Sequence, residues 1–152
     1  MLISEKNIFL NLEGNDKYEI FKNMIDMSDI SNDIKKYVYQ KVKEREEIQA
    51  TCVGGGIGMA HARFDSINGI GDIKVLMGVI RNGVDYDAID EQPVRIIFII
   101  LALKEKNREY LGVLSKISKI CRKKEIVEKI IISKNKQEII EILKSFEIEL
   151  GW

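Results

Sequence analysis

The chain is 152 residues long, with 45% hydrophobic and 32% charged residues and a single proline. This composition excludes a disordered or collagen-like chain, and the length suits one domain with one core, which we expect to span residues 1–152. Lysine plus arginine and aspartate plus glutamate number 24 each, so the formal net charge is +0. No overall field draws the protein to nucleic acid or to an anionic membrane, and the short basic run at 122–124 is typical of a solvated helix junction.

Targeting and membrane signals are missing from the sequence. The amino terminus lacks the basic region, apolar stretch and small-residue cleavage site of a signal peptide. The most apolar run, 94–103, is about half as long as a helix that spans a bilayer. We therefore expect a cytoplasmic protein with no direct membrane insertion. Cys52 and Cys121 form no CxxC pair, which predicts two idle thiols in place of a zinc site or a disulfide.

Two helices are predicted in the first third of the chain. Between residues 16 and 27 the apolar side chains fall on one helical face. Residues 31–33, Ser-Asn-Asp, then supply capping groups for a second helix. We expect this helix to turn Ile34, Tyr37, Val38 and Val42 inward and to end in the charged segment 43–47.

The middle of the chain has a different pattern. Residues 51–61 contain four glycines and no helical period, which predicts turns or close backbone approaches in place of a regular element. The apolar runs 73–80 and 94–103 indicate two buried strands. Between them, 81–83 (Arg-Asn-Gly) is a turn signal and 85–93 is a polar connection.

Three more helical patterns close the chain, over 109–122, over 124–132, and after Asn135, which forms a predicted capping box with Glu138. Helices before and after strands that are too apolar to face water imply a sheet covered on both sides. The sequence thus predicts an α/β fold, a mixed β-sheet flanked by helices on both faces in a three-layer α/β/α sandwich.

His61, at the end of the glycine-rich stretch, admits three interpretations: a structural residue, a metal ligand or a nucleophile. No second histidine and no cysteines or carboxylates at ligand spacing surround it, so we predict no metal site. Neutral imidazole is available near pH 7, because its unperturbed pKa is about 6.5. Glycines such as Gly56 let backbone N–H groups approach an anion, and Arg45 and Arg63 could neutralise phosphate oxygens. Phosphoryl transfer needs chiefly such positioning and charge stabilisation.

The glycine run also raises two other readings. A nucleotide loop does not fit, because the Lys-Ser/Thr pair of a P-loop is absent and the run follows helical patterns. A glycine-rich turn with no ligand stays open. No cofactor is predicted.

Several blocks of the sequence resemble a known family. Residues 51–61, Thr-Cys-Val-Gly-Gly-Gly-Ile-Gly-Met-Ala-His, resemble the motif Ser/Thr-Gly-x-Gly-x-Gly-x-Ala-x-Pro-His of fructose/mannitol-type enzyme IIA domains of the bacterial phosphotransferase system. Arg45-Glu46 is similar to the family's Arg-Glu pair. Residues 83–88 (Gly-Val-Asp-Tyr-Asp-Ala) and 93–95 (Pro-Val-Arg) resemble its next blocks. The likeness spans nearly the whole chain, in order and at matching spacing, and the family includes a nitrogen-regulatory branch.

The resemblance implies a mixed sheet flanked by helices and a phosphotransferase with a phosphohistidine intermediate. In the family the motif histidine receives phosphate from an HPr-type phosphocarrier and passes it to a IIB domain. Carried over, His61 is the phosphoacceptor and Arg45 the cation that stabilises the phosphate, with Arg63 in support. The segments before 16 and after 147 are too short for a IIB or DNA-binding domain, so we expect such partners on separate chains. The sequence does not decide whether the chain forms a homo-oligomer.

The sequence departs from the family pattern at four positions. Cys52 replaces a glycine, Gly58 an alanine and Ala60 the proline before the histidine. The largest change is Tyr110, which stands where the family commonly has a second active-site histidine. Its hydroxyl can donate a hydrogen bond to a phosphoryl oxygen but cannot supply a second imidazole; the other reading is a partly buried residue at a helix start.

Three functions follow from the resemblance. The first is a transport component that relays phosphate for uptake of a sugar or sugar alcohol. The second is a regulatory module whose phosphorylation state controls partner proteins. The third is a degenerate homologue that only binds partners.

Overall fold

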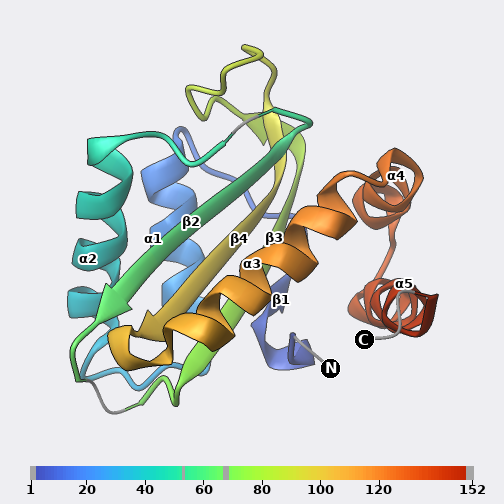
Figure 1. The fold of residues 1–152 in the computed structure, drawn as a ribbon. Helices are drawn as coiled ribbons and strands as arrows, with labels where there is room; N and C mark the ends of the chain where they lie inside the picture. The colour runs from blue at the N-terminus through green and yellow to red at the C-terminus, as the bar shows by residue number, and fades with distance from the viewer. Residues whose placement is uncertain (1–2, 53, 67–68, 150–152) are drawn as a thin grey trace.

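The structure, a computed structural model, describes residues 3–52, 54–66 and 69–149. Val53 of the glycine-rich stretch and the first and last residues of the expected 1–152 domain lie outside this description. At its centre is a four-stranded sheet in the order β1-β3-β4-β2 (Figure 1). Its strands are β1 (Ile8–Phe9), β2 (Ile57–Phe64), β3 (Ile73–Val84) and β4 (Val94–Leu103). β3 and β4 are antiparallel, while β1 pairs with β3 and β2 pairs with β4 in parallel, so the sheet is mixed and β2 forms one edge.

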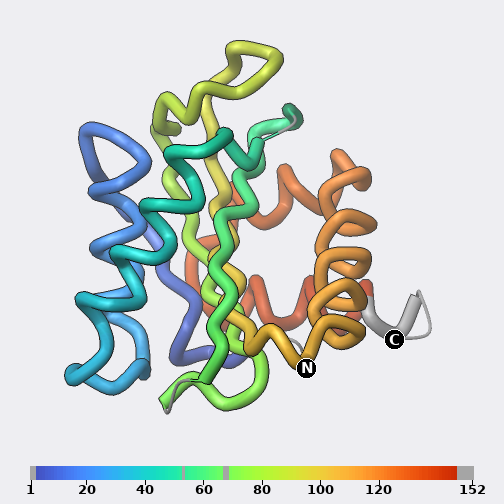
Figure 2. The backbone as a smooth tube through the Cα atoms, turned by 60° about the vertical axis from the view of Figure 1, so that its left-hand side comes forward, coloured from blue at the N-terminus to red at the C-terminus, as the bar shows by residue number. Residues whose placement is uncertain are grey.

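Helices cover both faces of this sheet. α1 (Lys17–Met27) and α2 (Lys35–Ile48) lie on one side, and α3 (Asn107–Cys121), α4 (Lys124–Ile132) and α5 (Lys136–Glu149) lie on the other, as Figure 2 shows. Short 3-10 turns occur at Glu5–Asn7 and Lys104–Lys106. The predicted three-layer α/β/α arrangement is confirmed.

β4 supplies both halves of the core, because successive side chains of a strand point to opposite faces. Ile97, Ile99 and Leu101 pack with buried residues of α1 and α2. Ile96, Phe98 and Ile100 pack with buried residues of α3, α4 and α5. The nearly unbroken apolar run of β4 is therefore explained by burial on two sides.

The helix signals were accurate, with exceptions at α2. The Asp16 side chain accepts a hydrogen bond from the Glu19 N–H (2.9 Å), and Asn135 Oδ1 accepts one from the Glu138 N–H (2.9 Å), so α1 and α5 are capped as their sequences predict. The prediction that residues 31–33 cap α2 with their side chains is wrong: Ile34 is the N-cap and no side chain caps it. Tyr37 is also not inward, since 51% of its surface is exposed.

Two further predictions are wrong in the middle of the chain. Residues 57–61 are not irregular, because β2 begins at Ile57 and runs through His61. The turn expected at 81–83 is part of β3, where the pairing register with β4 shifts between Val79 and Val84. Gly83 has a φ of 77°, so its glycine serves a bulge within the strand and not a chain reversal.

Candidate functional site

His61 lies on the edge strand β2, and strand alternation decides which way it faces. Ala60, Ala62 and Phe64 belong to the core beneath α1 and α2. The odd-numbered positions of β2 therefore face the α3 side, and this places His61 and Arg63 on that side. His61 is half-buried there, which leaves part of its ring open to solvent.

A groove of about 490 Å³ opens around His61. It is bounded by residues of α2, β2 and the start of α3, together with Lys104. Its lining residues are Lys41, Glu44, Arg45, Ile48, His61, Ala62, Arg63, Lys104 and Tyr110. Four of the predicted site residues thus meet here, and cations outnumber the single carboxylate of Glu44 among the lining residues.

The imidazole of His61 is held in one orientation. Its Nδ1 lies 3.2 Å from the carbonyl oxygen of Met59. A carbonyl oxygen only accepts, so Nδ1 carries the proton and Nε2 keeps its lone pair. Burial lowers the pKa of His61, and Arg45 and Arg63 act in the same direction, while Met59 and Glu46 oppose them. The ring is therefore neutral at physiological pH, with Nε2 available as a nucleophile.

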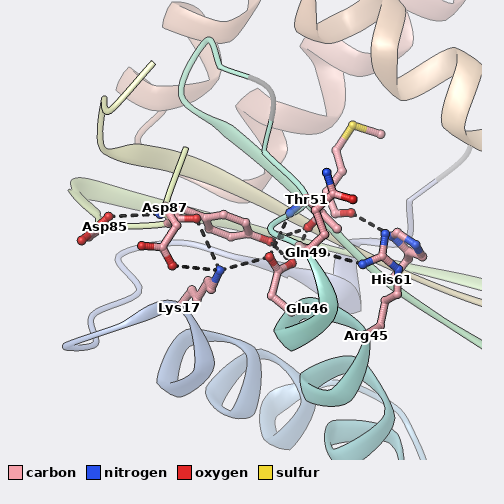
Figure 3. Close-up of polar contacts among 10 residues, drawn as sticks. Lys17, Arg45, Glu46, Gln49, Thr51, His61, Asp85 and Asp87 are labelled. Carbon is pink, nitrogen blue, oxygen red and sulfur yellow. Dashed lines mark hydrogen bonds and ion pairs between the residues drawn. The ribbon is translucent and has the colours of Figure 1, made fainter. Parts of the chain in front are cut away.

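Arg45 lies in the last turn of α2. Its Nη1 donates to the carbonyl oxygen of Gln49 (3.1 Å), which fixes the guanidinium across the end of the helix. Figure 3 shows Arg45 extending to the side of His61, in agreement with their shared groove. A half-buried guanidinium that lines the groove in this position can form paired hydrogen bonds to an anion that approaches the imidazole.

Arg63 is anchored more tightly. Its Nη1 donates to Asn107 Oδ1 (3.2 Å) and its Nη2 to the Lys104 carbonyl oxygen (3.1 Å). The guanidinium also stacks on the Tyr110 ring, with its central carbon 4.2 Å from the ring centroid. Nη1 is thus bound to the start of α3 and Nη2 to the 3-10 turn that precedes it, so Arg63 contributes its positive charge to the groove from a fixed position.

Tyr110 is 5% exposed and packs beside His61, with ring centroids 6.0 Å apart and an angle of 56° between the ring planes. Burial raises the pKa of its hydroxyl, which therefore stays a proton donor at neutral pH. The ring supports both His61 and Arg63, while the residue as a whole lines the groove.

The structure does not bring Gly56 to this site. It lies in the turn before β2, with a φ of 77°, and its carbonyl oxygen accepts the N–H groups of Arg95 (2.8 Å) and Ile96 (3.2 Å). It borders a separate hollow with Asp90 and Cys121. Its observed contacts serve the pairing of β2 with β4.

A buried polar cluster around Glu46, to which the sequence predictions gave no role, lies behind Arg45. Glu46 is 2% exposed and pairs with Lys17, whose Nζ lies 3.1 Å from Glu46 Oε2. The Glu46 carboxylate also accepts hydrogen bonds from Thr51 and Tyr86, and Figure 3 shows it between Lys17 and Thr51. A signal was present: position 46 continues the four-residue spacing of the inward positions 38 and 42.

Two further features of the described residues bear on other functions. Over residues 3–52, 54–66 and 69–149, no three histidine, cysteine, aspartate or glutamate side chains lie together as metal ligands would. Within the same ranges, no helix has the length and apolar character needed to cross a bilayer. Cys52 and Cys121 are both free thiols.

Comparisons with known proteins agree with the geometry. The sequence model of the family described as "Phosphoenolpyruvate-dependent sugar phosphotransferase system, EIIA 2" matches residues 1–146. The chain is 28% identical over 149 residues to the PTS system fructose-specific EIIABC component of Bacillus subtilis, covering 96% of this chain and 23% of that protein. It is 31% identical over 102 residues to the PTS system fructose-specific EIIA component of Haloferax volcanii, covering 66% of this chain and 63% of the relative. The chain thus spans less than two thirds of either relative.

A solved structure extends the comparison to the fold. The nitrogen regulatory protein IIA-Ntr from Neisseria meningitidis superposes with a TM-score of 0.81 at 26% identity, covering 93% of this chain and 96% of the other. The mixed sheet, its two helical layers and the sequence match over residues 1–146 lead to one assignment. The chain belongs to the EIIA 2 family of the phosphoenolpyruvate-dependent sugar phosphotransferase system.

Proposed function

We propose that residues 1–152 form one phosphoryl-carrier IIA domain, which accepts a phosphoryl group on His61 from an HPr-type phosphocarrier and passes it to a IIB domain on a separate chain. The observation that carries this proposal is the imidazole itself. Nδ1 is bound to the Met59 carbonyl, while Nε2 has no hydrogen-bond partner among residues 3–52, 54–66 and 69–149 and lies in a groove rich in cations. The proposed relay operates in the cytoplasm, where its free thiols remain reduced.

In the proposed step, the Nε2 lone pair attacks the phosphorus of the donor's phosphohistidine. The new bond is Nε2–P, the donor's N–P bond breaks, and its electron pair returns to the donor nitrogen. The His61 ring then carries a positive charge, which the Nδ1–H shares with the Met59 carbonyl oxygen. Transfer to a IIB acceptor is the same displacement with His61 as the leaving group.

The groove supplies the charge that this step needs. Arg45 and Arg63 neutralise the phosphoryl oxygens, and the Tyr110 hydroxyl donates to one of them. A hydrogen bond to a charged group contributes about 1.5–3 kcal/mol. Gly56 lies outside this arrangement, so the proposal gives it a structural role at the start of β2.

Transport and regulation use the same phosphoryl chemistry on His61 but differ in the partner protein that responds to it. The similarity to two proteins named as fructose-specific components favours a role in sugar uptake. The similarity to a nitrogen regulatory IIA protein, which covers nearly all of both chains, favours control of a partner protein as the second candidate. In each case the phosphoryl group sits on His61.

Purified components test the proposal. We would incubate the protein with enzyme I, HPr and phosphoenolpyruvate carrying labelled phosphorus, and compare the wild type with folded His61→Ala. The expected label is acid-labile and base-stable, is absent from the variant, and is bonded to Nε2 by phosphorus–nitrogen NMR. Failure of every HPr-type donor to label the wild type would sink the proposal.

Phosphate transfer to a purified IIB domain separates the two candidate roles. Rapid discharge of the labelled protein by a sugar-specific IIB domain is expected for the transport role. Retention of the label with every IIB domain, together with binding to a partner that depends on phosphorylation, would assign the protein to regulation.

A further inference from the structure

Glu46 is a buried carboxylate that uses both oxygens. Oε2 accepts from Lys17 Nζ (3.1 Å) and from the Thr51 N–H (2.9 Å). Oε1 accepts from the hydroxyls of Thr51 and Tyr86, the latter at 3.1 Å. Moving a charge out of water costs several kcal/mol, so this network must satisfy the carboxylate completely to be tolerated.

A path of hydrogen bonds through two residues, Thr51 and Met59, links this carboxylate to the imidazole of His61. The Thr51 carbonyl oxygen accepts the N–H of Met59 (3.1 Å), along the outer side of β2. The carbonyl oxygen of Met59 in turn lies 3.2 Å from His61 Nδ1. Glu46 thus binds Thr51, Thr51 binds the backbone of β2 at Met59, and the Met59 carbonyl orients the imidazole of His61.

The same contacts fix the second half of the site. Residues 46–51 form the turn that leaves α2, and the Glu46–Thr51 hydrogen bonds close it. Within this turn, Gln49 offers its carbonyl oxygen to Arg45 (3.1 Å). Arg45 and His61 come from different elements, and the closed turn joins them.

We propose that Glu46 is a positioning residue: through Thr51 and Met59 it holds the imidazole of His61 in the orientation that leaves Nε2 free. Replacement of a buried ion pair by apolar residues is often neutral or stabilising, so stability alone does not account for a carboxylate here. The inference rests on the proposed phosphoryl transfer for its purpose, but the positioning itself is a property of the unphosphorylated protein.

His61 is the one histidine of the chain, so its ring nitrogens give one unambiguous set of NMR signals. We would record the nitrogen-15 shifts of the imidazole in wild type, Glu46→Gln, Tyr86→Phe and Glu47→Gln. Glu47→Gln is the matched control, because it removes the same charge from the neighbouring position, where the side chain is 54% exposed. Tyr86→Phe removes a hydroxyl that contacts both Glu46 Oε1 (3.1 Å) and the Thr51 hydroxyl (3.0 Å), but it leaves both hydrogen bonds between Glu46 and Thr51 in place.

The wild type is expected to carry the proton on Nδ1. In Glu46→Gln the proton is expected to shift toward Nε2 and the pKa of His61 to fall, because the Glu46 charge raises that pKa. Glu47→Gln and Tyr86→Phe are expected to leave the ring signals unchanged. An unchanged ring in folded Glu46→Gln, or an equal shift in Tyr86→Phe, overturns the proposal.

Two further measurements keep the outcomes distinct. If Glu46→Gln does not fold, Thr51→Val replaces it: loss of the hydroxyl is expected to move the ring in the same direction, and no movement overturns the proposal. Phosphorylation by HPr is then expected to slow by roughly tenfold to a hundredfold in Glu46→Gln, as for a misplaced reacting group. If the wild type accepts no phosphate, the proposed function fails, but the NMR measurement still decides whether Glu46 positions the imidazole.

Discussion

His61 combines partial burial with two nearby guanidinium groups, and both features penalise the protonated ring. Its pKa in the folded protein therefore lies below the value of about 6.5 found in unfolded chains. As the pH falls from 6.5 toward the folded pKa, the unfolded chain takes up a proton that the folded protein does not. The folded state is thus expected to lose stability in this window. The rate of phosphoryl acceptance is expected to fall only at and below the folded pKa, where the ring of the folded protein is itself protonated. A proton NMR titration of the ring measures the pKa directly.

Substitution of Arg45 tests how far the neighbouring positive charge lowers the pKa of His61. Arg45→Gln is expected to raise the pKa of His61, because the Arg45 charge lowers it. Arg122→Gln removes an equal charge from the far end of α3, where the residue is exposed, and should leave the titration unchanged. A His61 pKa at or above 6.5 in the wild type would contradict the assigned effect of burial.

The hydroxyl of Tyr110 can be separated from its ring. Tyr110→Phe keeps the packing against His61 and Arg63 and removes only the proposed donor to the phosphoryl group. We expect phosphoryl transfer to slow by about tenfold, the lower end for a hydrogen bond to a charged group, with little change in the free energy of unfolding. Tyr37→Phe, on the exposed side of α2, is the control. A Tyr110→Phe rate equal to the wild-type rate would assign the residue a packing role alone.

Among the elements, β2 depends on the close approach of Tyr86. A Cβ at Gly58 would lie 2.6 Å from the Tyr86 ring, which is fully buried and held by Glu46. Gly58→Ala introduces the residue that the related motif carries, yet we expect it to destabilise this chain by about 1–3 kcal/mol. Urea unfolding followed by circular dichroism measures the change.

Gly112 in α3 is the control for that substitution, because a Cβ there meets nothing within 4 Å. Gly112→Ala is expected to stabilise the protein by about 0.5–1 kcal/mol, the usual gain in a helix. Equal changes in the free energy of unfolding for the two alanine variants would show that the Tyr86 ring can move aside without destabilising the protein.

The elements that could be predicted are those whose burial is continuous and periodic. α1, α4 and β4 follow their apolar patterns closely, because packing against the sheet decides those residues. β2 could not be recognised, since its buried positions are filled by Gly58, Ala60 and Ala62, and small residues give no apolar alternation. β1 pairs over only two residues, too few for any period to show.

The candidate site divides in the same way. His61, Arg45, Arg63 and Tyr110 were found from residue chemistry and resemblance, and the structure gathers them around one groove. Glu46 was named only as part of the Arg-Glu pair and was given no role, because a glutamate beside an arginine in a charged helix end is usually exposed. Its burial depends on Lys17 from another helix, a pairing that sequence spacing does not show.

At the scale of the whole molecule, the two cores share one sheet. Ile99 and Ile100 are adjacent and fully buried, but they point to the α1–α2 side and the α3–α5 side respectively. Ile99→Val and Ile100→Val should each cost about 0.5–1.5 kcal/mol. Because the side chains share no core, we expect the double variant to lose the sum within about 0.5 kcal/mol, in one cooperative transition. Two separate transitions in urea would show that the layers unfold independently.

The position of His61 within a strand has a consequence for any protein that reads its state. A strand anchored by β4 on one side and by Thr51 on the other has little freedom to rearrange when the ring is modified. Phosphorylation would instead add about −1.5 to −2 charge at one fixed point of a chain whose formal net charge is +0. A partner would thus detect a change in the local electrostatic potential of a surface whose shape stays the same. The protein would then have two states, phosphorylated and unphosphorylated, that differ in charge and not in conformation.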